Sequence, residues 1–322
     1  MTRPHISPLQ AIKKEIAQNS KILLAVSGGI DSMVLLHVCL ALKTELKLTL
    51  EVAHLDHGLR EESFNDAEFV KSICKDRSVD FHSHKVSPPN DSQNIEAWGR
   101  NERYSFFNKI LIQQNLDFIL TAHNANDVAE TLLMRLVSNK ELNSIDRIDF
   151  QRLLKRPFLY VTRDEIEKYS KDHQIQFKED SSNQDTRFLR NKIRHNLLPV
   201  LRENFDPRIV EVLSIRAEAL NEDIVAIEEI LLDSILIADT YEFATKAWRN
   251  CVHERLVKLP IGLQWRFAAL LFKNKLGFNL GRQHAKELVL FLKGDIQGLE
   301  LPGNLSLKTH LGAIIVGKNS SK

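Results

Sequence analysis

The chain has 322 residues, of which 43% are hydrophobic and 27% charged, and its formal net charge is +2. This length fits two domains, and the composition is typical of a globular protein rather than a disordered or fibrous one. A nearly neutral chain neither requires nor excludes a nucleic-acid partner, so any basic surface has to come from local clusters.

The cysteine and hydropathy patterns exclude several classes of protein. Cys39, Cys74 and Cys251 are far apart and form no Cys-x-x-Cys pair. This argues against a disulfide framework, a zinc site or a cysteine-ligated iron–sulfur cluster. The first residues contain no apolar core of signal-peptide length, and no later segment approaches a membrane span. We therefore expect a cytoplasmic protein with no membrane partner.

Short β-type runs alternate with longer helical patterns over the first 140 residues. Strands are predicted at 22–26, 48–55, 79–86 and 117–123, and helices at 31–44, 62–77, 94–115 and 125–137. This alternation predicts an α/β fold, a doubly wound and mostly parallel sheet with helices on both faces. In such sheets, ligands bind at the carboxyl ends of the strands, where the strand order reverses.

The rest of the chain is predicted to be mainly helical. Helical periodicity covers residues 208–256 and two segments after Gly262, whereas residues 299–318 have the pattern of two strands joined by a turn. We place a domain boundary near residue 210. This gives a first domain of residues 1–210 and a smaller helical domain of residues 211–322 that ends in a β-hairpin.

The stretch Ser-Gly-Gly-Ile-Asp-Ser, residues 27–32, separates the first predicted strand from the first predicted helix. Glycines let the backbone approach an anion closely, and the amides and dipole of the helix N-terminus face the same place. The run therefore predicts a nest for phosphate oxygens. Asp31 would repel phosphate unless a cation lies between them, so we expect it to bind Mg²⁺. A tight turn with an N-cap is the plainer alternative, which the complete run disfavours.

This run resembles the pyrophosphate loop (PP-loop) of the N-type ATP pyrophosphatases, which include amide synthetases and tRNA-modifying ligases and thiolases. The resemblance implies that the protein cleaves ATP between the α- and β-phosphates and adenylates a carbonyl oxygen. A nitrogen or sulfur nucleophile then displaces AMP. The loop alone does not separate these enzymes.

A second motif, HLDHGLR at residues 54–60, follows the second predicted strand. His54 and His57 have the spacing of metal ligands, but no third ligand accompanies them. A polar strand end with hydrogen-bonded imidazoles is the plainer interpretation. As part of a site, Asp56 and His57 would offer acid–base or cation-binding groups, and Arg60 would contact an anion.

A third motif lies on the predicted helix that contains NIEAWGRNERYSFF, residues 94–107. Glu96, Arg100 and Arg103 share one face of this helix. A surface ion pair accounts for Glu96 and Arg100. Arg103, next to Tyr104, is the member of this face that we expect to be functional.

A fourth motif, TAHNANDVAET at residues 121–131, lies at the end of the fourth predicted strand. His123, Asp127 and Glu130 are expected to face the phosphate nest where the strand order reverses. The two carboxylates lie in the first helical turn and can receive an ammonium group, Mg²⁺ or both. The helix dipole also favours acids there, which explains one of them but not the whole string.

A fifth cluster is basic. Residues 187–202 contain five Lys or Arg residues, including Arg190 and Arg194, and no acid. Such a stripe suits phosphates, although a charge run is more often simply solvated.

In their order and spacing, the five segments resemble the tRNA(Ile)-lysidine synthetases. The resemblance implies ATP-dependent adenylation of the wobble cytidine of an isoleucine tRNA, tRNA(Ile), with a CAU anticodon. The ε-amine of free L-lysine then attacks carbon 2 and expels AMP, which gives lysidine.

The resemblance also assigns site residues. The implied catalytic residues are Asp31, Asp56, His57, Arg103, Asp127, Glu130 and Arg194. The implied nucleotide contacts are Ser27, Gly28, Gly29, Ile30, Asp31, Ser32, His54, His123 and Arg190, with Mg²⁺ at Asp31. Asp127 and Glu130 would hold the lysine ammonium, while Arg103, Arg190 and Arg194 would steady the phosphate or the departing AMP.

Two places depart from the family pattern. Asn124 stands where the family has a second histidine, so we assign it no catalytic role. Residues 135–146, RLVSNKELNSID, keep Arg135 but lack the glycines of the family's Arg-Gly-x-Gly loop. Residues 211–322 are assigned to tRNA contact by position, and the oligomeric state is left open, with a homodimer as one option.

Other functions stay open at this point. A tRNA thiolase is disfavoured by the absence of cysteine pairs. A small-molecule amide synthetase would release AMP without tRNA. A degenerate RNA-binding or ATP-sensing protein is suggested by Asn124 and the missing glycines.

Overall fold

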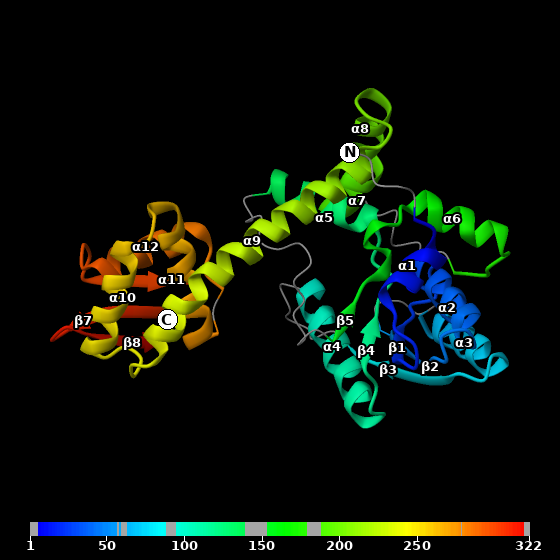
Figure 1. Ribbon diagram of the computed structural model, residues 1–322, viewed down its shortest axis with the longest axis horizontal. Helices are drawn as coiled ribbons and strands as arrows, with labels where there is room; N and C mark the ends of the chain where they lie inside the picture. The colour runs from blue at the N-terminus through cyan, green and yellow to red at the C-terminus, as the bar shows by residue number, and fades with distance from the viewer. Residues whose placement is uncertain are drawn as a thin grey trace. The chain divides into compact units, whose positions relative to one another are not determined.

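The computed structural model describes residues 6–56, 58, 63–87, 95–138, 153–178, 188–277 and 279–318. The chain separates into two compact units, with residues 1–134 and 145–218 in the first and residues 135–144 and 219–322 in the second. One of the boundaries lies inside helix α9 (Ile209–Asp239). Most elements of each unit are labelled in Figure 1. Within the described ranges, no helix combines the length and the hydropathy needed to cross a membrane.

The first unit is built on a parallel sheet whose described strands follow the order β3–β2–β1–β4–β5. The strands are β1 (Lys21–Ala25), β2 (Thr49–Asp56), β3 (Asp80–Lys85), β4 (Phe118–Leu120) and β5 (Leu154–Lys155). Because β1 pairs with both β2 and β4, the strand order reverses at β1. The predicted doubly wound parallel sheet is confirmed.

Helices surround this sheet. They are α1 (Pro8–Glu15), α2 (Ile30–Leu42), α3 (Ser63–Asp76), α4 (Ile95–Gln113), α5 (Ala125–Val137), α6 (Arg163–Asp172), α7 (Leu189–Lys192) and α8 (Leu198–Asn204). A 3₁₀ turn η1 (Pro157–Tyr160) precedes α6, and a π-helical turn η3 (Ile193–Leu197) joins α7 to α8.

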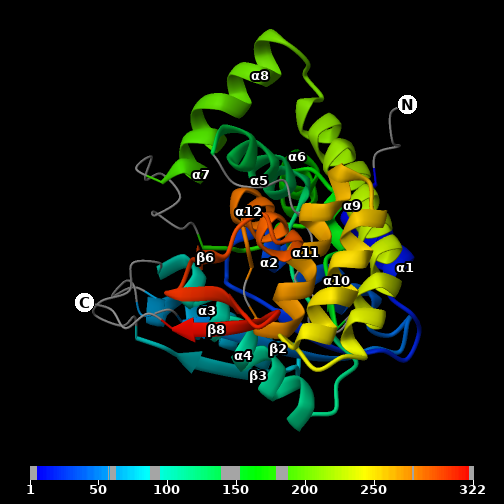
Figure 2. The same cartoon turned by 90° about the vertical axis from the view of Figure 1, so that its left-hand side faces the viewer.

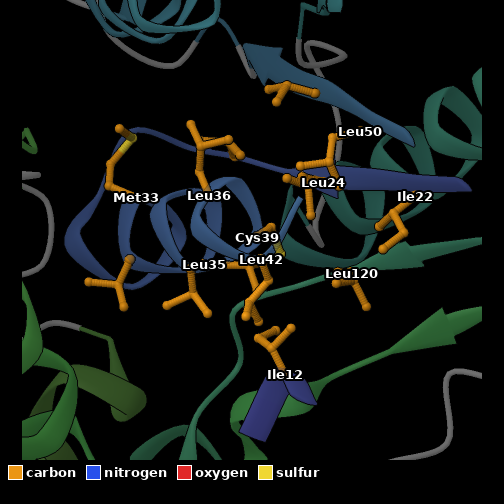
Figure 3. Close-up of a cluster of buried hydrophobic side chains, with 14 of the residues drawn as sticks. Ile12, Ile22, Leu24, Met33, Leu35, Leu36, Cys39, Leu42, Leu50 and Leu120 are labelled. Atoms are coloured by element: carbon orange, nitrogen blue, oxygen red, sulfur yellow. The ribbon is translucent and has the colours of Figure 1, made fainter. Parts of the chain in front are cut away.

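The central strand β1 buries side chains on both of its faces. Ile22 and Leu24 lie in the core that α1, α2, α3 and α6 form on one face (Figure 3), and Leu23 lies in the core that α4 forms on the other. Alternate residues of a strand point to opposite faces, which is why an unbroken apolar run suits a central parallel strand. Each such buried side chain contributes about 1.5–3 kcal/mol to folding.

Helix α5 has a core of its own. Its Ala129 and Leu133 are buried against Ile193 of η3, Leu198 of α8 and Val210 of α9. This packing holds the segment that follows residue 188 against the face of α5.

The second unit contains three further helices and an antiparallel sheet. The helices are α10 (Lys246–Lys258), α11 (Ile261–Leu276) and α12 (Arg282–Lys293), and the strands are β6 (Gly298–Leu301), β7 (Leu305–His310) and β8 (Ala313–Lys318). Figure 2 shows these helices beside the strands, and Trp248, Phe267, Phe291 and Leu307 are fully buried in the core between them. The predicted hairpin is confirmed as β7 and β8. Our two-strand pattern was incomplete, because β6 adds a third antiparallel strand.

Gly58 follows β2 in a conformation that only glycine accepts there. Its φ angle is +62°, and a β-carbon at this position would lie 2.5 Å from the carbonyl oxygen of Val86. That oxygen belongs to the backbone and has no rotamer by which to move away.

We expect Gly58→Ala to lower the free energy of unfolding by about 2–4 kcal/mol, since backbone strain and an overlap with the backbone add together. Gly277→Ala is the control. Gly277 has a φ angle of +72° with open space around it, so only the strain of about 1–2 kcal/mol remains. Equal losses in the two variants, measured by denaturant unfolding of the whole chain, would contradict the overlap at Gly58.

Candidate functional site

The phosphate loop joins β1 to α2 and is held by hydrogen bonds on two sides. The Ser32 hydroxyl donates to the Gly29 carbonyl at 2.9 Å, and Ser32 Oγ lies 3.2 Å from the Ser27 backbone nitrogen that donates to it. From outside the loop, the Lys178 N–H donates to the Gly28 carbonyl at 2.9 Å. Gly28 has a φ angle of +94°, in the left-handed region that favours glycine.

Helix α2 starts directly from this loop. Gly29 is its N-cap residue and supplies no side-chain cap. The first amides of a helix then depend on another acceptor, and together with the positive end of the dipole they favour an anion. The predicted nest of residues 27–32 therefore has the local structure that phosphate binding requires.

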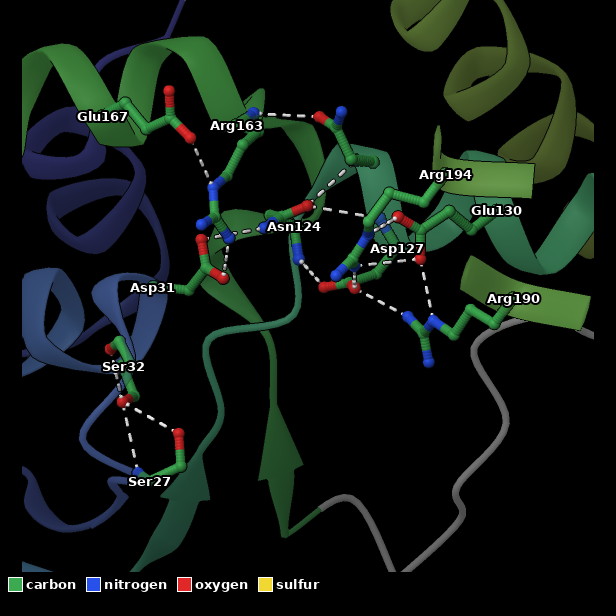
Figure 4. Close-up of polar contacts among 12 residues, drawn as sticks. Ser27, Asp31, Ser32, Asn124, Asp127, Glu130, Arg163, Glu167, Arg190 and Arg194 are labelled. Atoms are coloured by element: carbon green, nitrogen blue, oxygen red, sulfur yellow. Dashed lines mark hydrogen bonds and ion pairs between the residues drawn. The ribbon is translucent and has the colours of Figure 1, made fainter. Parts of the chain in front are cut away.

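Asp31, in the first turn of α2, is held by two partners from other elements. Arg163 Nη1 donates to Asp31 Oδ2 at 2.6 Å, and Asn124 Nδ2 donates to Asp31 Oδ1 at 3.1 Å (Figure 4). Burial raises the pKa of the Asp31 carboxyl to about 6, against the opposing effect of Arg163. At neutral pH Asp31 is thus ionised and already paired.

Asn124 connects the phosphate loop with the start of α5. Its Oδ1 accepts from the N–H groups of Asn126 and Asp127 at 3.0 and 3.2 Å, which makes it the N-cap of α5. Its own N–H donates to Asp127 Oδ2 at 3.0 Å, and its Nδ2 reaches Asp31. The position that departs from the family pattern is thus a structural link between α5 and the phosphate loop.

Asp127, Glu130, Arg190 and Arg194 form what we call the carboxylate–arginine cluster (Figure 4). Arg190 bridges the two acids, with Nη2 2.6 Å from Asp127 Oδ1 and Nε 2.7 Å from Glu130 Oε2. Arg194 donates to both oxygens of Glu130, at 2.6 Å from Nε and 3.1 Å from Nη2. The Glu130 side chain is only 1% exposed, so its charge is balanced almost entirely by these two guanidinium groups.

Arg163 is a member of the site that the sequence analysis missed. It is the first residue of α6, and besides Asp31 it binds Glu167 through Nε at 2.8 Å. Its backbone N–H donates to Asn126 Oδ1 at 2.9 Å, which anchors the start of α6 on α5. The capping box formed by Thr162 and Glu165 predicts a helix start here, but nothing local in the sequence indicates a contact with Asp31.

His123 is a partly buried, neutral imidazole. Its Nδ1 lies 2.9 Å from Thr121 Oγ1, and burial lowers its pKa to about 4, against an opposing effect of Asp127. The positive charges of Arg156, Arg190 and Arg103 lower this pKa further. His123 is therefore suited to hydrogen bonding rather than to ionic contact with phosphate.

The residues of the second motif lie at the end of β2 and form hydrogen bonds there. His54 is buried, with Nδ1 2.9 Å from the Val26 carbonyl oxygen, and burial lowers its pKa. Asp56 accepts from the Gly58 N–H at 2.8 Å in a tight turn. These contacts fit the polar strand end that was the plainer interpretation. Their predicted roles in the site stay predictions.

Of the other predicted residues, Arg103 lies near enough to His123 to affect its pKa, and several are not described. Burial lowers the pKa of the Arg103 guanidinium on α4, and the Arg100 guanidinium carbon lies 5.5 Å from the ring centre of Tyr104. His57 and residues 139–146 of the departing loop lie outside the described residues, as does the side chain of Glu96. Among the described residues, no group of three or more His, Cys, Asp or Glu has the arrangement of a metal site.

A cavity of about 500 Å³ in the first unit is separate from this site. It lies among α1, α6, α8 and the start of α9, and Thr162, Lys168, Arg202 and Glu211 are among the residues that line it. None of its lining residues belongs to the phosphate loop or to the carboxylate–arginine cluster.

Comparison with known proteins identifies the class to which this site belongs. Residues 2–201 match the family described as "PP-loop domain". The chain belongs to this family, and the predicted binding of ATP is confirmed to that extent.

Several curated proteins named tRNA(Ile)-lysidine synthase are similar in sequence, which confirms the predicted resemblance. One from Clostridium tetani is 29% identical over 93% of this chain, one from a Nostoc species is 35% identical over 65%, and one from Treponema denticola is 40% identical over 58%. The chain covers 65%, 62% and 42% of the respective lengths of these relatives.

A solved structure supports the fold. The U34-tRNA thiolase NcsA from Methanococcus maripaludis, with its [4Fe-4S] cluster, superimposes with a TM-score of 0.56 at 15% identity. The match covers 67% of this chain and 78% of the thiolase. At this identity, the likeness concerns the fold alone.

We expect the His123 ring to stay neutral as the pH falls from 8 to 5, because its pKa of about 4 lies well below the ordinary value near 6.5. Its ring resonances, followed by NMR and assigned with a His123→Gln variant, should show a midpoint near pH 4. A midpoint near 6.5 would contradict the buried placement.

Variants of Asn124 should separate its two contacts. Asn124→Ser keeps an N-cap oxygen but cannot reach Asp31, whereas Asn124→Ala loses both contacts. We expect only the alanine variant to lose about 1 kcal/mol of stability, and both variants to bind ATP more weakly by a similar factor. Thermal unfolding and equilibrium ATP binding measure the two effects. Unchanged ATP affinity in both variants would show that the contact with Asp31 is dispensable.

Proposed function

We propose that this chain is a tRNA(Ile)-lysidine synthetase, an ATP-dependent ligase that forms a carbon–nitrogen bond. One observation carries the proposal: in a PP-loop domain, two carboxylates suited to an ammonium group lie on the helix next to the phosphate loop. Asn124 connects them to that loop through Asp31 and Asp127. The curated relatives described above bear the same name.

The phosphate loop would bind the β- and γ-phosphates that leave as pyrophosphate. Ser27, Gly28, Gly29, Ile30 and Ser32 supply the backbone amides, hydroxyls and dipole end for this. The proposed adenylation requires the triphosphate of ATP to bind at this loop, and the preference of the loop for an anion supports that position.

Asp31 is the residue that would hold Mg²⁺. In proteins Mg²⁺ commonly takes one or two carboxylates and completes its shell with water and substrate phosphates. Asp31 is an ionised carboxylate beside the phosphate nest, and a cation that arrives with ATP would share it with Arg163, which donates to its Oδ2. When bound, the ion would neutralise charge that develops on the phosphates.

The carboxylates of Asp127 and Glu130 would bind the ε-ammonium of free L-lysine. An ammonium is not a nucleophile, so a neighbouring base has to take one proton before the amine attacks carbon 2 of the adenylated cytidine. The attack forms the carbon–nitrogen bond, and AMP departs with the former carbonyl oxygen. Arg103, Arg190 and Arg194 would stabilise the phosphate of this leaving group, with His123 and His54 as neutral contacts.

Contact with tRNA would use the basic stripe and the second unit. Arg190, Lys192, Arg194 and Arg202 follow Phe188, which is 62% exposed. Exposed aromatic rings next to arginines are typical of single-stranded RNA contact, since bases stack on both. In this proposal residues 1–210 are the catalytic domain and residues 211–322 contribute to tRNA binding.

The proposal predicts that purified protein with ATP, Mg²⁺ and L-lysine releases AMP and pyrophosphate only when tRNA(Ile) with a CAU anticodon is present. Mass spectrometry of the digested tRNA should then show cytidine converted to lysidine. AMP release with lysine but without tRNA would instead favour a small-molecule amide synthetase. Modification that depends on a sulfur donor would favour a thiolase.

We expect Asp31→Ala to reduce lysidine formation by a factor on the order of 100 or more, because the Mg²⁺ proposed to neutralise charge on the reacting phosphates loses its carboxylate ligand. Affinity for tRNA should stay within about twofold, because Asp31 is hydrogen-bonded by Arg163 and Asn124 rather than by the arginines of the basic stripe. Asp164→Ala, at a carboxylate that is 66% exposed, is the matched control and should retain activity. Full turnover by the Asp31 variant would refute the role of Asp31.

A further inference from the structure

The two acids proposed to bind lysine are already occupied by the protein's own arginines. Each oxygen of the Glu130 carboxylate accepts at least one guanidinium hydrogen bond, at 2.6 to 3.1 Å. Of the Asp127 oxygens, Oδ1 accepts from Arg190 at 2.6 Å and Oδ2 accepts from the Asn124 N–H at 3.0 Å. An ammonium has three N–H donors and needs the same acceptors.

Arg190 occupies the position that an ammonium would take. Its guanidinium spans both acids, since Nη2 binds Asp127 and Nε binds Glu130. Arg194 contacts Glu130 in a fork and lies farther from Asp127, at 3.5 Å. A cation that bridges the two acids therefore competes with Arg190 first.

The charge of the cluster makes this competition severe. Two carboxylates and two guanidinium groups sum to zero, and an added ammonium would leave one positive charge without a counterion beside Glu130, whose side chain is 1% exposed. Such an uncompensated charge is strongly unfavourable. Lysine can enter at low cost only if a guanidinium group finds another anion.

ATP supplies such an anion. Guanidinium groups form bidentate hydrogen bonds with phosphate as readily as they do with carboxylate. The side chains of Arg190 and Arg194 are 35% and 31% exposed, so neither is enclosed by its carboxylate partners. Asn124 connects Asp127 to Asp31 of the phosphate loop, so the anion site lies beside the cluster.

We propose that Arg190 is a placeholder for the substrate ammonium, and that nucleotide binding opens the lysine site by drawing Arg190 from the carboxylates to phosphate. This inference rests on the proposed function and adds an order to it, with ATP before lysine. Because coupling between two ligands is reciprocal, lysine also strengthens nucleotide binding by the same factor.

The test is equilibrium dialysis of labelled L-lysine against the full-length chain, with and without Mg²⁺ and a non-hydrolysable α,β-methylene analogue of ATP. We expect lysine to bind at least about tenfold more tightly with the analogue, within the usual range of coupling between sites. Equal affinity within about twofold overturns the placeholder role while leaving the proposed function intact. Absence of lysine binding in both conditions refutes the proposed function itself.

Variants of Arg190 give a second, independent readout. Arg190→Gln frees the acids, so lysine should bind at least about fivefold more tightly than to the unmodified chain when no nucleotide is present, and the effect of the analogue should shrink to about twofold. Arg190→Lys keeps a competing cation and should preserve the coupling. Arg208→Gln is the matched control, an arginine outside the basic stripe that pairs with Asp206 at 3.5 Å, and should behave like the unmodified chain. Weaker lysine binding to Arg190→Gln in both conditions would show that Arg190 helps to bind lysine, which contradicts the proposal.

Discussion

The parallel pairing of β4 with β1 is the constraint on which the rest of the site depends. It brings the carboxyl ends of two strands, and the helices that follow them, to the same edge of the sheet. The α2 and α5 N-termini are thereby neighbours, although Asn124 and Asp31 are 93 positions apart in the chain. One helix start presents uncapped amides to an anion and the other presents carboxylates to a cation, so a single strand pairing creates two adjacent sites of opposite preference.

Charges buried at this edge contribute less to stability than their short distances suggest. Desolvation of a buried ion pair offsets most of the attraction between its partners, whereas removal of one partner costs about 3–5 kcal/mol. Glu130 is the extreme case, because it is 1% exposed and balanced by two arginines. The carboxylate–arginine cluster therefore contributes little to the stability of the fold, which comes from the apolar cores. It is better suited to holding charged groups in positions where one partner can replace another.

Much of this architecture could be predicted from the sequence because its signals are local. Alternating strand and helix periods, together with the glycines before Ser32, predict the first four strands of the sheet and the phosphate loop within a few residues of the observed bounds, whereas the short strand β5 was not predicted. The position of the fourth strand beside the first followed from the general behaviour of doubly wound sheets. These features can be inferred from the short-range pattern of the sequence and from the general topology of parallel sheets.

The remaining features depend on contacts between distant segments. Arg163 meets Asp31 across 132 positions, and no spacing rule links a helix start to a carboxylate that far away. Asn124 was given no role because it departs from the family pattern. Its side-chain amide nevertheless caps α5 through Oδ1 and donates to Asp31 through Nδ2, and only the structure shows that one side chain makes both contacts. The strand β6 was missed as a separate element, although a turn at Pro302, Gly303 and Asn304 separates it from β7.

The hydrogen bond from the Lys178 N–H to the Gly28 carbonyl has a consequence for sequence divergence. This bond uses main-chain atoms alone, so it does not depend on the side chain at position 178, whose Nζ lies 5.5 Å from the ring centre of Phe69. Evolution can vary charge and size at this position while the loop keeps its shape. Proline is the exception, since it lacks the N–H group and would leave the Gly28 carbonyl without this donor.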